Sequence, residues 1–290
     1  MTLVPDDDAH GALPGPVASR DVEGLARWIA ARTRSGETRI VGINGAQGSG
    51  KSTLAGRLRH ALGKDHACAA VVLAIDDFYA TRAQRSALAD AVHPLLITRG
   101  VPGTHDVELM SATLERLRHL RAGHTLRLPH FVKAQDDRAP ADRGVLVTGP
   151  VDVVLFEGWC VGTPPQAEAE LLDPINRLEA EEDRDGRWRR YVNAQLAGPY
   201  ARLFGSLDRL VFLQAPDFAV VHRWRLQQEA GNAAAAPRAD HVMDAAALQR
   251  FIAHYERLTR HALHALPSHA DVVFELDEQR RPLAVRYRGG

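Results

Sequence analysis

Cysteine is scarce in this sequence, with 2 residues among 290. Cys68 and Cys160 lie far apart, each inside an apolar run, and this placement is typical of buried free thiols in a reducing compartment. A fold that depends on a disulfide framework is therefore excluded, and we expect a cytoplasmic protein.

An excess of charge of one sign and long hydrophobic runs are also missing. Lys plus Arg and Asp plus Glu each total 36, so the basic excess typical of nucleic-acid-binding proteins is absent. No apolar run approaches the roughly 20 residues that a membrane-spanning helix needs. We therefore expect neither a nucleic acid nor a membrane as a partner. The acidic start of the chain has no signal-peptide pattern, and we expect residues 1–20 to be a flexible lead-in.

The sequence does contain 45% hydrophobic residues, enough for a single sizeable domain over residues 21–290. Four apolar, β-branched runs predict buried parallel strands, at 39–45, 69–79, 151–159 and 209–216. Helical patterns lie between and after them, at 52–62, 106–122, 187–205, 217–230 and 244–265. This alternation predicts an α/β fold, with a doubly wound, mainly parallel sheet flanked by helices. Residues 270–288 predict a C-terminal edge hairpin.

The stretch GAQGSGKS, from Gly45 to Ser52, matches the phosphate-binding pattern G-x-x-x-x-G-K-[ST]. It follows a predicted buried strand and opens a predicted helix, which is the context that a P-loop requires, so we expect a P-loop NTPase fold. Backbone N–H groups and the helix N-terminus would face the phosphates. We expect a nucleoside triphosphate on Gly45, Ala46, Gln47, Gly48, Ser49, Gly50, Lys51, Ser52 and Thr53. Lys51 would bridge the β- and γ-phosphates, and Ser52 would ligate Mg²⁺.

Carboxylates end two further predicted strands. Glu157 lies where P-loop enzymes carry a magnesium carboxylate, so we expect it to support Mg²⁺ together with Ser52. An ordinary strand-end acid is the alternative. Asp76 and Asp77 end the second run, where a carboxylate can accept the proton of an attacking hydroxyl, and a simple turn is the alternative. No N-K-x-D sequence follows the later strand, which argues against a GTPase.

The P-loop, the sequence IDDFY and the sequence LFEGW together resemble the small-molecule P-loop kinases that include uridine kinase, phosphoribulokinase and pantothenate kinase. RGVPGTHD at 99–106 and FEGWCVG at 156–162 are similar to the D-glycerate 3-kinase group, and the similarity covers about residues 39 to 265. The resemblance implies ATP as the phosphoryl donor, Asp76 as the catalytic base, and D-glycerate as the acceptor that becomes 3-phosphoglycerate.

A small anionic acceptor needs cations and hydrogen-bonding groups around it. RGVPGTHD offers Arg99, Thr104, His105 and Asp106, although capping of the next helix is an alternative role for the last three. PHFVKAQDDRAP adds Lys133 and Arg138 as cations for a carboxylate, and we expect Asp77 and Tyr79 to shape the floor of the site. Glycerate kinases commonly read aspartate-lysine-serine where this chain has Val132, Lys133 and Ala134.

Arg223 and Arg225, in HRWRLQQE, match an arginine-bearing lid in the same resemblance, and we expect this lid to cover about residues 223–243. Closure would bring cations to the γ-phosphoryl group, whereas a solvated helix face is the alternative. The piece 231–240 is expected to be mobile and to interrupt two helices.

Two other functions stay open at this point. One is a kinase of the same fold that acts on a nucleoside or a pantothenate-like acceptor, which the departure at Val132 leaves possible. The other is a P-loop regulator that binds ATP without any acceptor.

Overall fold

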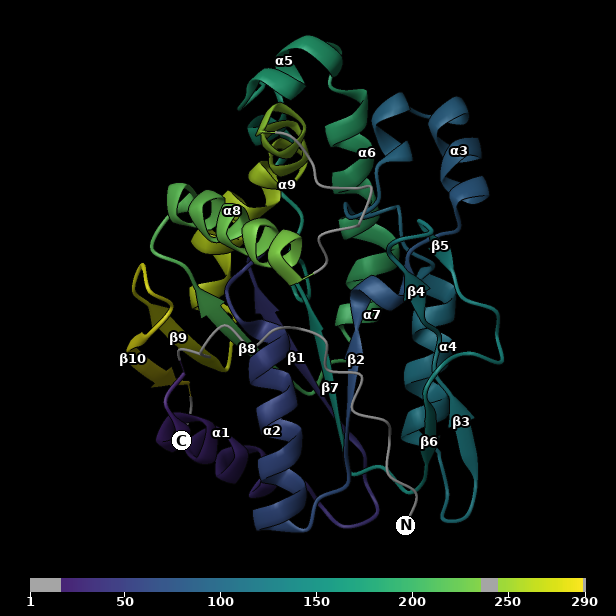
Figure 1. The fold of residues 1–290 in the computed structure, drawn as a ribbon, viewed down its shortest axis with the longest axis vertical. Coiled ribbons are helices and arrows are strands. Elements are labelled where there is room, and N and C mark those ends of the chain that lie inside the picture. The colour runs from purple at the N-terminus through teal and green to yellow at the C-terminus, as the bar shows by residue number, and fades with distance from the viewer. Residues whose placement is uncertain (1–16, 236–244, 289–290) are drawn as a thin grey trace.

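A six-stranded sheet with the order β10-β9-β8-β1-β7-β2 forms the frame of the molecule (Figure 1). The computed structural model describes residues 17–235 and 245–288. The strands of this sheet are β1 (Arg39–Gly45), β2 (Ala70–Ala74), β7 (Val153–Gly158), β8 (Arg209–Gln214), β9 (Val272–Leu276) and β10 (Pro282–Tyr287). β10 pairs antiparallel with β9, and the other pairs are parallel. The predicted α/β class, the mainly parallel sheet and the C-terminal hairpin are confirmed.

Strand residues alternate between two hydrophobic cores, one on each face of the sheet. In β7, Val154 and Phe156 pack into one core, and Val153 and Leu155 pack into the other. All four are 0% exposed, and full burial of such side chains contributes roughly 1.5 to 3 kcal/mol each. Both faces of the sheet are covered, which explains why this strand is apolar at every position from Val153 to Phe156.

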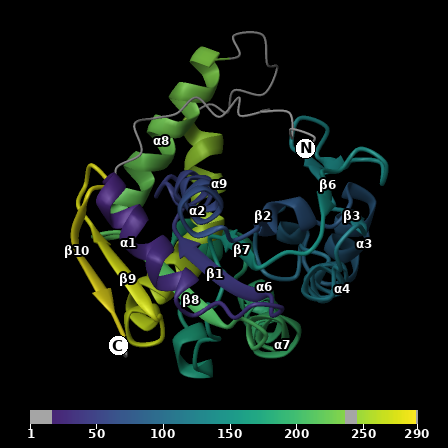
Figure 2. The same cartoon turned by 90° about the horizontal axis from the view of Figure 1, so that it is seen from below.

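Helices cover the two faces of the sheet (Figure 2). The first core contains residues of α4 (Val107–Arg118), α6 (Arg187–Gln195) and α7 (Ala201–Phe204). The second contains residues of α1 (Ser19–Ala30), α2 (Lys51–His66) and α8 (Phe218–Ala235). α9 (Ala245–Ala265) contributes to both cores. Across the described residues, no helix is both long and apolar enough to cross a bilayer.

The second predicted strand, 69–79, is too long. β2 ends at Ala74, and residues Ile75–Phe78 form a 3₁₀ turn. The reason is packing: Ile75 and Phe78 are 1% and 0% exposed, so both ends of the turn are anchored in the core while the two aspartates between them point away. In a flat strand, Ile75 and Phe78 would lie on opposite faces of the sheet.

Several elements were not predicted from the sequence, although the first of them has an amphipathic pattern that buries Val22, Leu25, Ala26 and Ile29. They are α1, α3 (Arg82–Ala91), α5 (Arg177–Glu182), and two short hairpins made of β3 (Thr125–Arg127) with β6 (Leu146–Thr148) and of β4 (Phe131–Val132) with β5 (Asp137–Arg138). α1 begins at Ser19, inside the expected flexible lead-in, and residues 1–16 of that lead-in lie outside the described part of the chain.

Helix boundaries also differ from the prediction. The helix expected over 187–205 contains a π-helical turn at Leu196–Tyr200, where Pro199 lacks an N–H group to donate. The break expected over 231–240 is wrong for its first half, because α8 continues to Ala235 through three alanines, the best helix formers. The second half lies among residues 236–244, outside the described residues.

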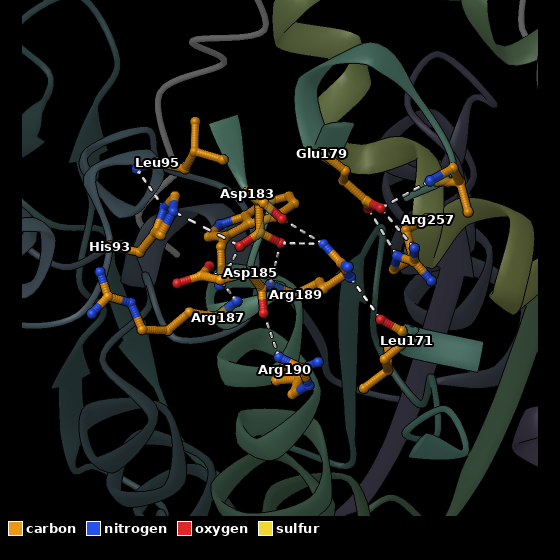
Figure 3. Close-up of polar contacts among 12 residues, drawn as sticks. His93, Leu95, Leu171, Glu179, Asp183, Asp185, Arg187, Arg189, Arg190 and Arg257 are labelled. Carbon is orange, nitrogen blue, oxygen red and sulfur yellow. Dashed lines mark hydrogen bonds and ion pairs between the residues drawn. The ribbon is translucent and has the colours of Figure 1, made fainter. Parts of the chain in front are cut away.

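Two buried ion pairs hold the region of α5, α6 and α9 together (Figure 3). Arg257 of α9 donates to both carboxylate oxygens of Glu179, at 2.8 and 2.6 Å. Arg189 of α6 pairs with Asp183 at 2.9 Å. Both carboxylates are 0% exposed, so each depends on its arginine for compensation of a buried charge.

His93, Asp183 and Asp185 lie close enough together to suggest a metal site. However, the oxygens of Asp183 already accept hydrogen bonds from the backbone N–H groups of Trp188 and Arg189 and from the Arg189 guanidinium. Asp183 therefore stabilises the start of α6. Both of its carboxylate oxygens already accept hydrogen bonds, so neither is free to bind a metal ion.

Replacing Arg257 by Met is expected to lower the free energy of unfolding by about 3 to 5 kcal/mol, because it leaves the charge of Glu179 buried and unpaired. Urea denaturation measures the effect. Arg260→Met is the matched control on the same helix, because the Arg260 side chain is 57% exposed whereas that of Arg257 is 7% exposed. Similar losses in both variants would contradict this account.

Candidate active site

The carboxyl ends of three adjacent strands meet at one edge of the sheet. β7 lies between β1 and β2, and Glu157 of β7 is in register with Ile43 of β1 and Ala74 of β2. The P-loop begins at the end of β1, and Asp76 follows the end of β2. Parallel pairing therefore brings the phosphate-binding motif, Glu157 and Asp76 together, as expected for ligand sites in doubly wound folds.

The P-loop has the conformation that its motif predicts. Gly48 and Gly50 have φ angles of 76° and 90°, in the left-handed region that favours glycine. A Cβ atom on Gly48 would come within 2.9 Å of the Cβ of Trp224, so the loop also leaves no room for a side chain there. α2 begins at Lys51, and its unpaired N-terminal N–H groups provide a site for an anion.

Ser52 and Glu157 form a pair of oxygen groups beside the P-loop. The Ser52 hydroxyl donates to Glu157 Oε1 at 2.6 Å, and Glu157 is 6% exposed. Burial raises the pKa of Glu157 above its ordinary value, and the charge of Lys51 and the Ser52 hydrogen bond offset this only in part. A buried carboxylate next to a hydroxyl is a suitable donor set for Mg²⁺, which prefers oxygen ligands, and the ion would compensate the buried charge.

Asp76 has partners on both carboxylate oxygens. The Tyr79 hydroxyl donates to Oδ1 at 2.8 Å, and the Lys133 ammonium donates to Oδ2 at 2.8 Å. Burial by itself would raise the pKa of Asp76, but the positive charges of Lys133 and Lys51 and the Tyr79 hydrogen bond outweigh it and hold the pKa well below its ordinary value. Asp76 is therefore ionised at neutral pH.

The segment RGVPGTHD lies against the same edge of the sheet, but its residues have different tasks. Thr104 is 0% exposed and uses its hydroxyl inside the loop, as a donor to Val101 O at 2.7 Å. Asp106 accepts from the N–H of Leu109 at 3.0 Å and so caps α4, which confirms the capping role for this residue. Asp106 also pairs with Arg138 at 3.1 Å.

His105 is buried at the centre of this segment. Its ring stacks on Tyr79 at 4.7 Å between centroids, and its Nδ1 lies 2.7 Å from the Tyr200 hydroxyl. That hydroxyl also accepts from the N–H of Gly103, so its own proton is available for Nδ1. Burial lowers the pKa of His105 to about 4, which keeps the imidazole neutral at physiological pH.

Three polar residues of this region were not predicted from the sequence, namely Arg85, His130 and Asp136. Asp136 forms ion pairs with Arg99 and with the buried Arg85, the latter at 2.8 Å. His130 lies 3.0 Å from Asp77 Oδ1, and that contact raises the pKa of His130. Arg99 was expected at the site, but no local signal links it to Asp136, because the contact spans 37 residues of sequence.

The two arginines of the expected lid point in different directions. Arg223 pairs with Glu278 at 3.0 Å on the turn between β9 and β10, and its side chain is 53% exposed. Arg225 donates to Gln228 at 3.0 Å and lies over the ring of Phe251. Residues 236–243 of the expected lid are outside the described part of the chain, so lid closure stays a prediction.

The turn between β9 and β10 also contacts the P-loop, which no sequence motif predicts. Arg280 Nε donates to Gly48 O at 2.6 Å, although 232 residues separate the two. The Arg280 guanidinium lies 5.1 Å from the ring of Trp224, and Trp224 Nε1 donates to Glu278 O at 2.7 Å. The C-terminal hairpin and α8 therefore fix the outer side of the phosphate-binding loop.

The site is that of a P-loop phosphotransferase. It combines the P-loop at the end of β1, the acidic residues Glu157 and Asp76 near the ends of the neighbouring strands, and two lysines close to these acidic residues. The chain is 34% identical over 203 residues to the uncharacterized kinase mug58 of Schizosaccharomyces pombe, covering 66% of this chain and 69% of that protein. It is 29% identical over 259 residues to the chloroplastic D-glycerate 3-kinase of Arabidopsis thaliana, covering 84% of this chain and 54% of that enzyme. No family model matches the chain.

Solved structures agree with these relatives. The D-glycerate 3-kinase from Cryptococcus neoformans var. grubii superimposes with a TM-score of 0.75 at 26% identity, over 93% of this chain and 98% of that one. The chain belongs to the D-glycerate 3-kinase-like family of P-loop kinases and is a small-molecule kinase. It spans about half the length of the plant enzyme, whose name assigns it to the chloroplast, and the cytoplasmic location of this chain stays a prediction.

The buried His105 predicts a loss of stability at mildly acidic pH. Its pKa is about 4 in the folded protein against an ordinary value of 6.5, so between these values the unfolded chain binds a proton that the folded chain does not. Stability therefore falls as the pH falls through this window. Between pH 7 and pH 5 the wild type should lose about 2 kcal/mol more than His105→Gln. Urea denaturation at both pH values measures this, and replacement of the exposed His124 should not reduce the loss.

Arg280→Gln is expected to raise the Kd for ATP several-fold, because Gly48 O loses its charged donor and the P-loop loses one of its contacts with the C-terminal turn. Isothermal titration calorimetry measures the affinity. Arg281→Gln is the matched control, since Arg281 lies in the same turn but pairs with Asp277 at 2.9 Å. Equal affinity in the wild type and Arg280→Gln would show that the hairpin does not support nucleotide binding.

Proposed function

We propose that this protein transfers the γ-phosphoryl group of ATP to a hydroxyl of a small hydroxy acid, with D-glycerate as the acceptor and 3-phosphoglycerate as the product. The observation that carries the proposal is the meeting of Lys51, Asp76 and Lys133 at one edge of the sheet. The charges of both lysines act on Asp76, so the phosphate-binding loop, the candidate base and a cation for the acceptor share one site.

On the donor side, the P-loop from Gly45 to Thr53 binds the phosphates through backbone N–H groups and the N-terminus of α2. Lys51 neutralises charge on the transferring group. Ser52 and Glu157 hold Mg²⁺, which when bound neutralises the phosphate oxygens. Arg223 and Arg225 are proposed to add positive charge when the lid closes.

On the acceptor side, Asp76 orients the attacking hydroxyl and takes its proton. The carboxylate of the acceptor is held by cations from RGVPGTHD and from the β4–β5 hairpin, namely Arg99, Lys133 and Arg138. His105 donates to an acceptor oxygen as a neutral group, and Asp77 and Tyr79 shape the floor. Such a site acts mainly by positioning and charge neutralisation.

The aromatic groups near Asp76 argue for an acid rather than a nucleoside. Tyr79 is 4% exposed and Phe131 is 3% exposed, and their rings contact each other at 5.1 Å between centroids. The ring of Tyr79 also stacks on that of His105. Neither ring offers a free face on which a base could stack, whereas the Lys133 side chain is 60% exposed.

The test is ADP release by the purified protein with ATP and Mg²⁺, comparing D-glycerate, L-glycerate, uridine, pantothenate and no acceptor. We expect strong stimulation by D-glycerate alone, and Asp76→Asn should lower it by about 10²- to 10⁴-fold while ATP binding persists. Stimulation by uridine or pantothenate instead would assign another acceptor. Release that is the same without any acceptor would identify a regulator rather than a kinase.

A further inference from the structure

Lys133 contacts the candidate base itself. Its ammonium lies 2.8 Å from Asp76 Oδ2, while the Tyr79 hydroxyl occupies Oδ1. Both oxygens of the carboxylate therefore already have donors. In this state Asp76 has little affinity for a proton, because the adjacent ammonium stabilises its charged form.

This pairing conflicts with the role of Asp76. A general base works best when its proton affinity is matched to the operating pH, and an ion-paired aspartate is far from that match. The same ammonium is also expected to hold the carboxylate of the acceptor. One lysine cannot fully neutralise both carboxylates, so the acceptor and Asp76 compete for it.

The other two cations of the acceptor site are committed elsewhere. Arg99 pairs with Asp136, and Arg138 pairs with Asp106 and donates to Tyr79 O at 3.2 Å. Lys133 differs in two respects: its partner is Asp76, and its side chain is long, flexible and 60% exposed. Moving the ammonium from Asp76 to the carboxylate of the acceptor exchanges one ion pair for another, so the gain of the second pair offsets the loss of the first.

We propose that Lys133 is a specificity switch, which the carboxylate of the acceptor draws away from Asp76 so that only an acidic acceptor activates the base. The inference rests on the proposed function, and it makes the carboxylate of the substrate more than an anchor. A neutral polyol that enters the same site leaves Lys133 paired with Asp76, and it is therefore phosphorylated slowly.

The chemical step follows without a further reactant. The acceptor O–H bond breaks and its proton goes to Asp76 Oδ2, while the oxygen forms a bond to the γ-phosphorus. The bond from that phosphorus to the bridging oxygen of ADP breaks, and its electron pair stays on ADP. Asp76 then releases the proton to solvent, and Lys133 returns to it when the product leaves.

Lys133→Gln with two acceptors separates a switch from an anchor. The acceptors are D-glycerate and D-glyceramide, its uncharged amide with the same hydroxyl groups. If Lys133 is a switch, the variant loses turnover of D-glycerate but gains about tenfold in kcat with D-glyceramide, because Asp76 is no longer suppressed. If Lys133 is only an anchor, turnover of D-glyceramide does not rise, and the proposal is overturned.

Two further variants are the controls. Lys133→Arg keeps the positive charge and should show no gain with D-glyceramide. Arg138→Gln removes a cation whose carboxylate partner is Asp106, so it should lower turnover of D-glycerate without raising that of D-glyceramide. A gain in either control would contradict a switch that depends on the charge of Lys133 at Asp76.

The wild type gives a second readout that needs no variant. In the pH range above about 4.5, where the carboxyl group of D-glycerate stays ionised, kcat with D-glycerate should fall at acidic pH as Asp76 is protonated. With D-glyceramide that fall should be absent, because Lys133 keeps the aspartate ionised. Identical profiles would overturn the proposal.

Failure of the inference and failure of the proposed function give different results. If the wild type phosphorylates D-glycerate but Lys133→Gln shows no gain with D-glyceramide, only the switch is wrong. If the wild type does not phosphorylate D-glycerate at all, the proposed function is wrong and the switch falls with it. ATP binding by Lys133→Gln, measured by calorimetry, verifies that the variant is folded.

Discussion

The parallel pairing of β7 with β1 on one side and β2 on the other is the constraint on which the site depends. It places Glu157 level with Ile43 near the end of β1 and with Ala74 at the end of β2, beside the P-loop and the turn that carries Asp76. The strands can lie in this arrangement because both faces of the sheet are buried. The apolar packing of the two cores thus holds together charged groups that would otherwise repel one another or separate in solvent.

Electrostatics then gives each carboxylate its character. Burial raises the pKa of Glu157, and the charge of Lys51 and the Ser52 hydrogen bond offset this only in part. Asp76 is close to both Lys51 and Lys133, and the charges of these lysines outweigh the effect of burial and lower its pKa. The two acidic groups have similar positions at strand ends, but they differ because Lys133 comes from a hairpin that contacts Asp76 directly.

The family relationship and the geometry support each other at different levels. The relatives and the fold establish a small-molecule P-loop kinase, while the choice of acceptor depends on side chains at the rim of the site. Some of those side chains come from the short β4–β5 hairpin, where Val132 and Ala134 depart from the pattern of glycerate kinases. Lys133 is kept between them, and its ammonium lies 2.8 Å from Asp76 Oδ2.

The sequence by itself determined the α/β class, the P-loop, and the position of Glu157 and Asp76 towards the carboxyl ends of apolar runs, because each depends on the periodicity or spacing of neighbouring residues. Only the tertiary structure decided which charges meet. The contact of Lys133 with Asp76 spans 57 residues, and that of Arg280 with Gly48 spans 232. Such contacts follow from strand order and from packing of distant elements, which no local pattern encodes. For the same reason the buried ion pair between Glu179 of α5 and Arg257 of α9 could not be predicted from the sequence.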